Sequence, residues 1–200
     1  MLKKRIAVLV SGGGTNFKAL LEAEQNGIIS TGEIVLAVAD RTGAYALERA
    51  RAAGVKACLL DKKALGGLEK FEYRLLKLLE EEDIDLIVLA GFLSILSAEF
   101  TQHYKKRIIN IHPSLIPAFC GPGYYGLKVH KEALKRGVKV SGATVHFVND
   151  IADGGEIIAQ QAVPVLPGDS PQSLQQRIME QAEWQLLPRA VEEVCRSIND

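Results

Sequence analysis

Short apolar runs, each followed by a helical stretch, constrain the fold of this chain more than any other feature. Residues 6–10, 33–40 and 55–60 are such runs, and helical patterns at 17–24, 44–53 and 68–79 follow them before a fourth run at 84–90. A continuous apolar run is typical of a strand buried on both faces of a parallel sheet, and parallel strands need a helical crossover between them. The sequence therefore predicts an α/β protein with a mostly parallel sheet.

The second half of the chain departs from this alternation. After another run at 108–112, residues 138–148 and 156–165 predict two longer strands joined by a polar turn, which makes them antiparallel. Ser170 and Pro171 predict the start of a C-terminal helix, which we expect Pro188 to end or kink. The expected fold is a Rossmann-like three-layer sheet, mostly parallel, with a late antiparallel element and a C-terminal helix.

Charge and cysteine content exclude several classes of protein. The 24 Lys and Arg residues balance the 24 Asp and Glu residues, so no net charge favours nucleic acid or an anionic membrane as a partner. The first apolar run is too short for a signal peptide or a membrane span. Three distant cysteines outside any metal-ligand spacing predict free thiols, no metal site and a cytoplasmic location. We expect a monomer or a weak homodimer.

A glycine-rich turn follows the first predicted strand. Residues 11–16 are Ser-Gly-Gly-Gly-Thr-Asn, and the free N–H groups of the next helix would face whatever lies above the strand. No Lys-Ser or Lys-Thr pair follows, as a Walker loop requires, and Phe17 replaces the third glycine of a dinucleotide-binding fingerprint. The turn is therefore interpreted as a site for one phosphate, or as a tight turn that binds nothing.

Two polar side chains mark the end of the predicted strand 108–112. Asn110 and His112 lie two residues apart, so an extended chain points both toward one small volume, and Pro113 ends the strand. An amide donor beside an imidazole suits stabilisation of an oxyanion and transfer of a proton. The alternative is a strand end whose Asn caps a turn and whose His lies at the surface.

Two further segments are expected near this strand end. The apolar loop 91–96 follows a strand and either fills the core or presents an apolar wall to a flat ring. The turn 149–155 carries Asp150 and Asp153, and an acid beside a histidine keeps the imidazole protonated or oriented. His146 and Asp150 are second candidates for catalysis.

Four of these segments, 11–16, 90–96, 110–115 and 141–155, together resemble the family of folate-dependent phosphoribosylglycinamide formyltransferases nearly end to end. They are similar to its phosphate loop, its folate wall, its catalytic strand end and its Ser-x-x-x-His…Asp-Gly-Gly segment. The middle two are shared with other formyl-tetrahydrofolate enzymes, and the glycine loop narrows the choice. The resemblance implies a single formyltransferase domain over residues 1–200. It also implies transfer of a formyl group from 10-formyltetrahydrofolate to glycinamide ribonucleotide, in purine biosynthesis.

The resemblance also implies roles for individual residues. His112 would be the general acid, Asn110 would bind the oxyanion, and Asp153 would raise the pKa of the histidine. The implied substrate-binding residues hold the phosphate and the ribose hydroxyls and are Gly14, Thr15, Asn16 and Glu183. The implied cofactor-binding residues are Leu93, Ser94, Ile95, Leu96, Asn110, Asn149, Asp150 and Asp153.

The chain differs from the family pattern at four places. Trp184 stands where a His usually follows the ribose-binding Glu, which leaves the register of Glu183 open. Ser94 replaces a frequent basic residue, the loop 118–126 is longer than the usual link, and an early-helix Arg of the family has no clear match near Leu68. These last three differences leave the contacts to the folate tail open. The alternatives are a tRNA formyltransferase or a formyltetrahydrofolate hydrolase, for whose additional domains we expect no room, and a non-catalytic nucleotide-binding module that would use only the glycine loop.

Overall fold

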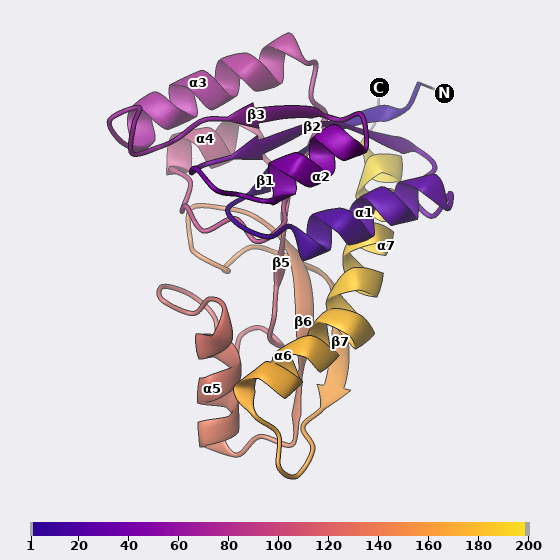
Figure 1. Cartoon of the computed structure of the whole chain (residues 1–200), viewed down its shortest axis with the longest axis vertical. Helices are drawn as coiled ribbons and strands as arrows, with labels where there is room; N and C mark the ends of the chain where they lie inside the picture. The colour runs from indigo at the N-terminus through magenta and orange to yellow at the C-terminus, as the bar shows by residue number, and fades with distance from the viewer. Residues whose placement is uncertain (1, 199–200) are drawn as a thin grey trace.

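The computed structural model describes residues 2–198, and these contain one seven-stranded sheet with the order β3-β2-β1-β4-β5-β6-β7 (Figure 1). The first five strands are parallel, while β6 is antiparallel to both β5 and β7. The predicted parallel sheet with a late antiparallel element is therefore confirmed. The strands are β1 (Lys4–Val10), β2 (Gly32–Ala39), β3 (Lys56–Leu59), β4 (Leu86–Leu89), β5 (Ile108–His112), β6 (Val140–Phe147) and β7 (Ile157–Pro164).

Helices cover both faces of the sheet, as the apolar runs require. Along β1, Ile6 and Val8 join a core with α1, α2, α6 and α7, whereas Ala7 and Leu9 join a second core with α3 and α4. Strand residues alternate between faces, so each face of β1 has its own helical cover. The helices are α1 (Thr15–Gln25), α2 (Ala46–Ala52), α3 (Leu68–Glu81), α4 (Ala98–His103), α5 (Leu127–Arg136), α6 (Pro171–Ile178) and α7 (Trp184–Ser197).

The C-terminal helical region begins where the sequence predicts and passes the proline that was expected to end or kink it. Ser170 caps α6 with a capping box, and Pro171 is its first residue. The π-helical turn η1 (Met179–Glu183) follows α6, and α7 continues through Pro188 to Ser197, so this proline does not end the helix, while the kink stays a prediction. A π turn widens the helix and is frequent at functional sites, and Glu183 at its end is buried.

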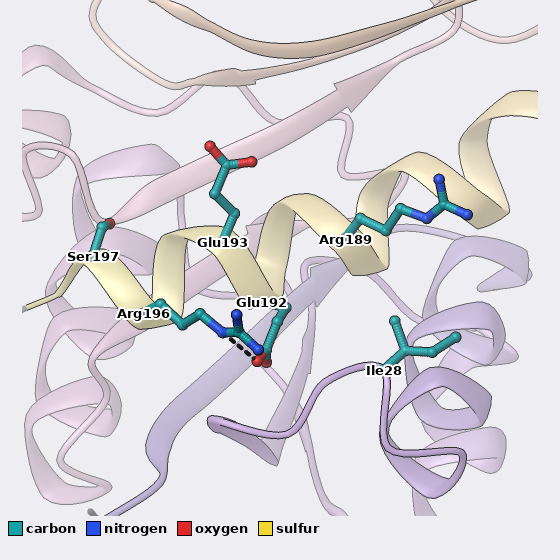
Figure 2. A pocket seen from close by; sticks show the side chains of 6 residues that line it. All are labelled: Ile28, Arg189, Glu192, Glu193, Arg196 and Ser197. Atoms are coloured by element: carbon teal, nitrogen blue, oxygen red, sulfur yellow. Dashed lines mark hydrogen bonds and ion pairs between the residues drawn. The ribbon is translucent and has the colours of Figure 1, made fainter.

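A buried carboxylate joins α7 to the turn before β2. Glu192 accepts hydrogen bonds from the backbone N–H and hydroxyl groups of both Ser30 and Thr31. Arg196 donates to it from the next helical turn (Figure 2). Burial alone would raise the pKa of Glu192, but the bonds from Ser30 and Thr31 together lower it to about 2. Glu192 also lines a surface hollow of about 510 Å³, and Figure 2 shows the side chains around it.

Candidate active site

The carboxyl ends of β1, β4 and β5 face a cleft with a volume of about 420 Å³. Its walls come from the glycine turn, the apolar loop 91–96, the end of β5, the loop 121–126, the segment 148–153, and α6 with η1. The structure thus brings together around one cavity the segments that the sequence singled out. Ligand sites of open α/β sheets lie at this edge.

The three predicted catalytic residues meet in this cleft. Nδ1 of His112 lies 3.5 Å from Oδ2 of Asp153, and Nδ2 of Asn110 lies 3.5 Å from Oδ1 of the same carboxylate. Asn110 and His112 come from β5, while Asp153 comes from the loop between β6 and β7. The backbone N–H of Gly121 donates to Oδ2 of Asp153 at 2.8 Å. A strand end and a distant loop therefore form one polar cluster.

Both nitrogens of the His112 ring face protein acceptors. Nε2 lies 2.9 Å from the carbonyl oxygen of Phe119, on the side of the ring away from Asp153. Phe119 and Asp153 both have positive φ, 51° and 56°. A non-glycine residue in this region stores backbone strain, which is common at functional sites. The two strained residues hold the ring between them.

Burial and charge act in opposite directions on His112. Burial, the larger effect, lowers its pKa, while the charge of Asp153 and the contact with Phe119 raise it by less. Asp153 thus acts in the predicted direction, but the pKa of His112 ends below its ordinary value, which corrects the expectation of a raised one. Burial alone would raise the pKa of Asp153, but His146, His112 and Gly121 together lower it, so the carboxylate stays charged.

His146 belongs to the same cluster. It lies opposite Asn110 in the β5–β6 pair, with its Nε2 atom 3.1 Å from Nδ2 of Asn110 and 3.6 Å from Oδ1 of Asp153. Its Nδ1 atom lies 2.7 Å from the carbonyl oxygen of Phe147. Sequence reasoning ranked it second, because the register of an antiparallel pair decides which residue stands opposite Asn110, and that register is not visible in either strand alone.

The glycine turn and η1 are linked across the cleft. Thr15 and Asn16 line the cavity, and Nδ2 of Asn16 donates to Oε2 of Glu183 at 2.6 Å. Burial raises the pKa of Glu183, and the bond from Asn16 opposes it. Gly14, the N-cap of α1, is not one of the lining residues. It has φ 70°, and a Cβ there would lie only 2.6 Å from Cβ of Ala46. The structure therefore brings Glu183 to the predicted phosphate turn.

The apolar loop divides between wall and core. Leu93 and Ile95 are 49% and 61% exposed, whereas Leu96 is buried in the core with α3 and α4. Ser94 is buried as well, and its hydroxyl donates to Asp40 at 2.6 Å and accepts from Nζ of Lys62 at 2.7 Å. The exposed wall thus consists of two side chains, and Lys62 reaches the loop at the position that lacks the basic residue.

The segment after β6 contributes less than predicted. Asn149 and Asp153 line the cleft, but Asp150 is exposed and is not one of the lining residues. Its neighbours Ile151 and Ala152 line the cavity instead. Some lining residues were not predicted individually, because an apolar or amide side chain on a helix or loop has no distinguishing pattern in the sequence. They include Phe92, Tyr124, Tyr125, Gln175 and Met179.

None of the helices within residues 2–198 combines the length and the apolar character needed to cross a membrane. Within the same residues, no group of three or more His, Cys, Asp or Glu side chains is placed to hold a metal ion. The three cysteines are unpaired, as the sequence predicts.

Comparison with known proteins adds relatives that match most of the chain. It is 42% identical over 190 residues to a trifunctional purine biosynthetic protein adenosine-3 of Drosophila melanogaster. The match covers 94% of this chain but only 14% of that protein. It is 37% identical to the phosphoribosylglycinamide formyltransferase of Haemophilus influenzae, over 94% of this chain and 85% of that one.

Solved structures and a family model agree with these relatives. The crystal structure of glycinamide ribonucleotide transformylase 1 from Symbiobacterium toebii superposes with a TM-score of 0.90 at 40% identity, over 99% of this chain and 91% of that one. The model of the formyl transferase family matches residues 4–191. The chain therefore belongs to the formyl transferase family.

Proposed function

We propose that this chain transfers the formyl group of 10-formyltetrahydrofolate to the amine of 5′-phosphoribosylglycinamide, giving formylglycinamide ribonucleotide and tetrahydrofolate in purine biosynthesis. Membership of the formyl transferase family supports a formyl group as the group that is transferred. The name of the Haemophilus relative supports phosphoribosylglycinamide as the acceptor, and the match covers 85% of that protein. The single structural observation that carries the proposal is the cluster of Asn110, His112 and Asp153 at the cleft.

The chemistry of formyl transfer matches this cluster. The acceptor amine attacks the formyl carbon and loses a proton, negative charge develops on the formyl oxygen, and the departing nitrogen gains a proton. Asn110 would donate a hydrogen bond to the oxygen. His112, whose two ring nitrogens face Phe119 and Asp153, would act as the general acid toward the departing nitrogen, and the proton that the amine loses would restore the ring. Asp153 would orient the ring and stabilise its charged form.

The two ends of the cleft would separate the two substrates. The N–H groups at Gly14, Thr15 and Asn16, at the start of α1, would hold the phosphate, and Glu183 would bind the ribose hydroxyls. Leu93 and Ile95 would cover the flat ring of the folate with Ser94, Leu96, Asn149 and Asp153 around it. The exposed apolar pair and the volume of about 420 Å³ fit such a ligand.

The proposal is tested by incubating the protein with 10-formyltetrahydrofolate, with and without the ribonucleotide, and following tetrahydrofolate release. Release only when the ribonucleotide is present supports the transfer. Release in its absence would indicate a hydrolase, and no release in either case would indicate a non-catalytic nucleotide-binding module. The cytoplasmic location and the monomer or weak homodimer stay predictions.

A further inference from the structure

Arg49 of α2 contacts the glycine turn but is not one of the residues that line the cleft, and it has no role yet in binding. Its Nε–H donates to the carbonyl oxygen of Gly13 at 2.9 Å. We propose that Arg49 is a positioning residue, which directs the N–H of Gly14 toward the substrate phosphate by holding the carbonyl of Gly13. The inference rests on the proposed function, in which that N–H helps to hold the phosphate.

The carbonyl of Gly13 and the N–H of Gly14 belong to the same peptide group. This peptide bond is trans, and in a planar trans peptide the two groups point in opposite directions. Arg49 holds the carbonyl toward α2, so the N–H of Gly14 points away from α2. The preceding peptide group is held in the same way, because the backbone N–H of Ala46 donates to the carbonyl of Gly12 at 3.1 Å. Two successive carbonyls of the turn are thus tied to α2.

The N–H groups on the other side of these two peptides are free. Within residues 2–198, neither Gly13 nor Gly14 has a hydrogen-bond acceptor for its backbone N–H. Successive N–H groups that point the same way form a concave site for an anion. The start of α1, which follows directly, adds its own unpaired N–H groups and the positive end of the helix dipole. The contacts to α2 therefore leave the turn with donors that suit a phosphate.

The surroundings of Arg49 favour this role over that of a surface ion pair. Among the described residues, the Gly13 carbonyl is its only hydrogen-bond partner, and no carboxylate pairs with it. Its guanidinium carbon lies 5.0 Å from the centre of the Tyr45 ring, a cation–π contact that steadies the side chain. Arg51, two residues further along the same helix, is instead ion-paired with Glu48. The side chain of Arg49 is therefore held against the turn.

Titration with inorganic phosphate tests the turn without any reaction. We expect the backbone amide proton of Gly14 to move downfield and to reach a plateau in nitrogen–proton correlation spectra of the ¹⁵N-labelled protein, because an anionic acceptor deshields the hydrogen that it binds. A Gly14 amide that does not respond to phosphate would overturn the proposal, whatever reaction the protein catalyses.

Matched variants test whether the bond to Gly13 positions this amide. Arg49→Gln places an uncharged N–H donor near the position of Nε, whereas Arg49→Met has a side chain of similar length and no donor. We expect Arg49→Met to weaken phosphate binding about 10-fold, the scale of one hydrogen bond, and Arg49→Gln to stay within about threefold of the unaltered protein. Arg51→Met removes the same charge from the same helix without touching the turn, so it is the control and should bind phosphate normally.

Equal losses in Arg49→Gln and Arg49→Met, or no loss in either, would show that the bond to Gly13 does not position the turn. If Arg49→Met does not fold, Arg49→Gln decides alone. Phosphate binding within about threefold of normal then supports the role of the donor, and a loss of about 10-fold contradicts it.

Kinetics with two acceptors separate this role from a general structural one. With the ribonucleotide, Arg49→Met should raise KM about 10-fold and change kcat little. With glycinamide riboside, which lacks the phosphate, the variant and the unaltered protein should have the same kcat/KM. An equal loss of kcat/KM with both acceptors would overturn the proposal. If the unaltered protein transfers no formyl group, the proposed function fails, and the phosphate titrations still decide whether Arg49 positions the turn.

Discussion

At the scale of single residues, Asp153 is the residue whose carboxylate lies close to Asn110, His112 and His146 alike. We predict that Asp153→Asn lowers kcat by about 10²–10³-fold with a much smaller change in KM, the scale of a lost charge-stabilising group. The charge of Asp153 opposes the effect of burial on His112, so its removal lowers the pKa of His112 further. The limb of the kcat–pH profile that reports His112 should therefore shift to lower pH. Asp150→Asn, an exposed change three residues away, is the matched control and should leave both kcat and the profile unchanged.

Gly14 allows a second test at this scale. It has φ 70°, and a Cβ would come within 2.6 Å of Ala46, whereas Gly12 has open space around it and no such φ. We predict that Gly14→Ala lowers the free energy of unfolding by roughly 1–3 kcal/mol, through strain and overpacking, and that Gly12→Ala has an effect within about 0.5 kcal/mol. Chemical denaturation measures both. Equal effects would mean that the tight approach of the turn to α2 is not what requires glycine.

At the scale of elements, the loop 91–96 combines a wall and an anchor. We predict that Ile95→Asp weakens folate binding and leaves ribonucleotide binding nearly intact, because Ile95 is 61% exposed and a charge there enters an apolar contact. Leu96→Asp is the contrasting variant. It buries a charge in the core with α3 and α4, so it should lower stability by several kcal/mol. Calorimetric titration and thermal unfolding separate the outcomes, and equal loss of both ligands in Ile95→Asp would contradict the assignment.

The limits of sequence reasoning also lie at this scale. The positions of the strands followed from apolar runs, and Asn110 and His112 stood out because polar side chains at the end of a buried strand conflict with their surroundings. The pairing of Asn110 with His146 could not be predicted in this way, because the register of β5 on β6 depends on two segments of the chain, and these two residues are 36 positions apart. The helix also continues past Pro188, and the π-helical turn η1 that comes before it has no distinguishing residue in the sequence.

At the scale of the whole molecule, acid should weaken the junction between α7 and the turn before β2. The pKa of Glu192 is lowered to about 2 from an ordinary value of 4.5, so its contribution is complete above pH 4.5 and is lost as the pH falls through about 2. We predict that Glu192→Gln lowers the free energy of unfolding at pH 7 by about 1–3 kcal/mol and makes stability less dependent on pH in that window. Glu193→Gln, exposed on the same helix, is the control. Denaturation curves at several pH values measure both, and identical pH dependence of the two variants would contradict the role of Glu192.

The bond between Asn16 and Glu183 has a consequence for the order in which the molecule is made. The two residues are 167 positions apart, and each supplies part of the same wall of the cleft. A ribosome releases Asn16 early and Glu183 only when nearly all of these residues have been synthesised. This wall of the cleft is therefore incomplete while the residues between the two are made, and a ligand that binds the folded cleft cannot use this wall to stabilise the chain until η1 has been synthesised.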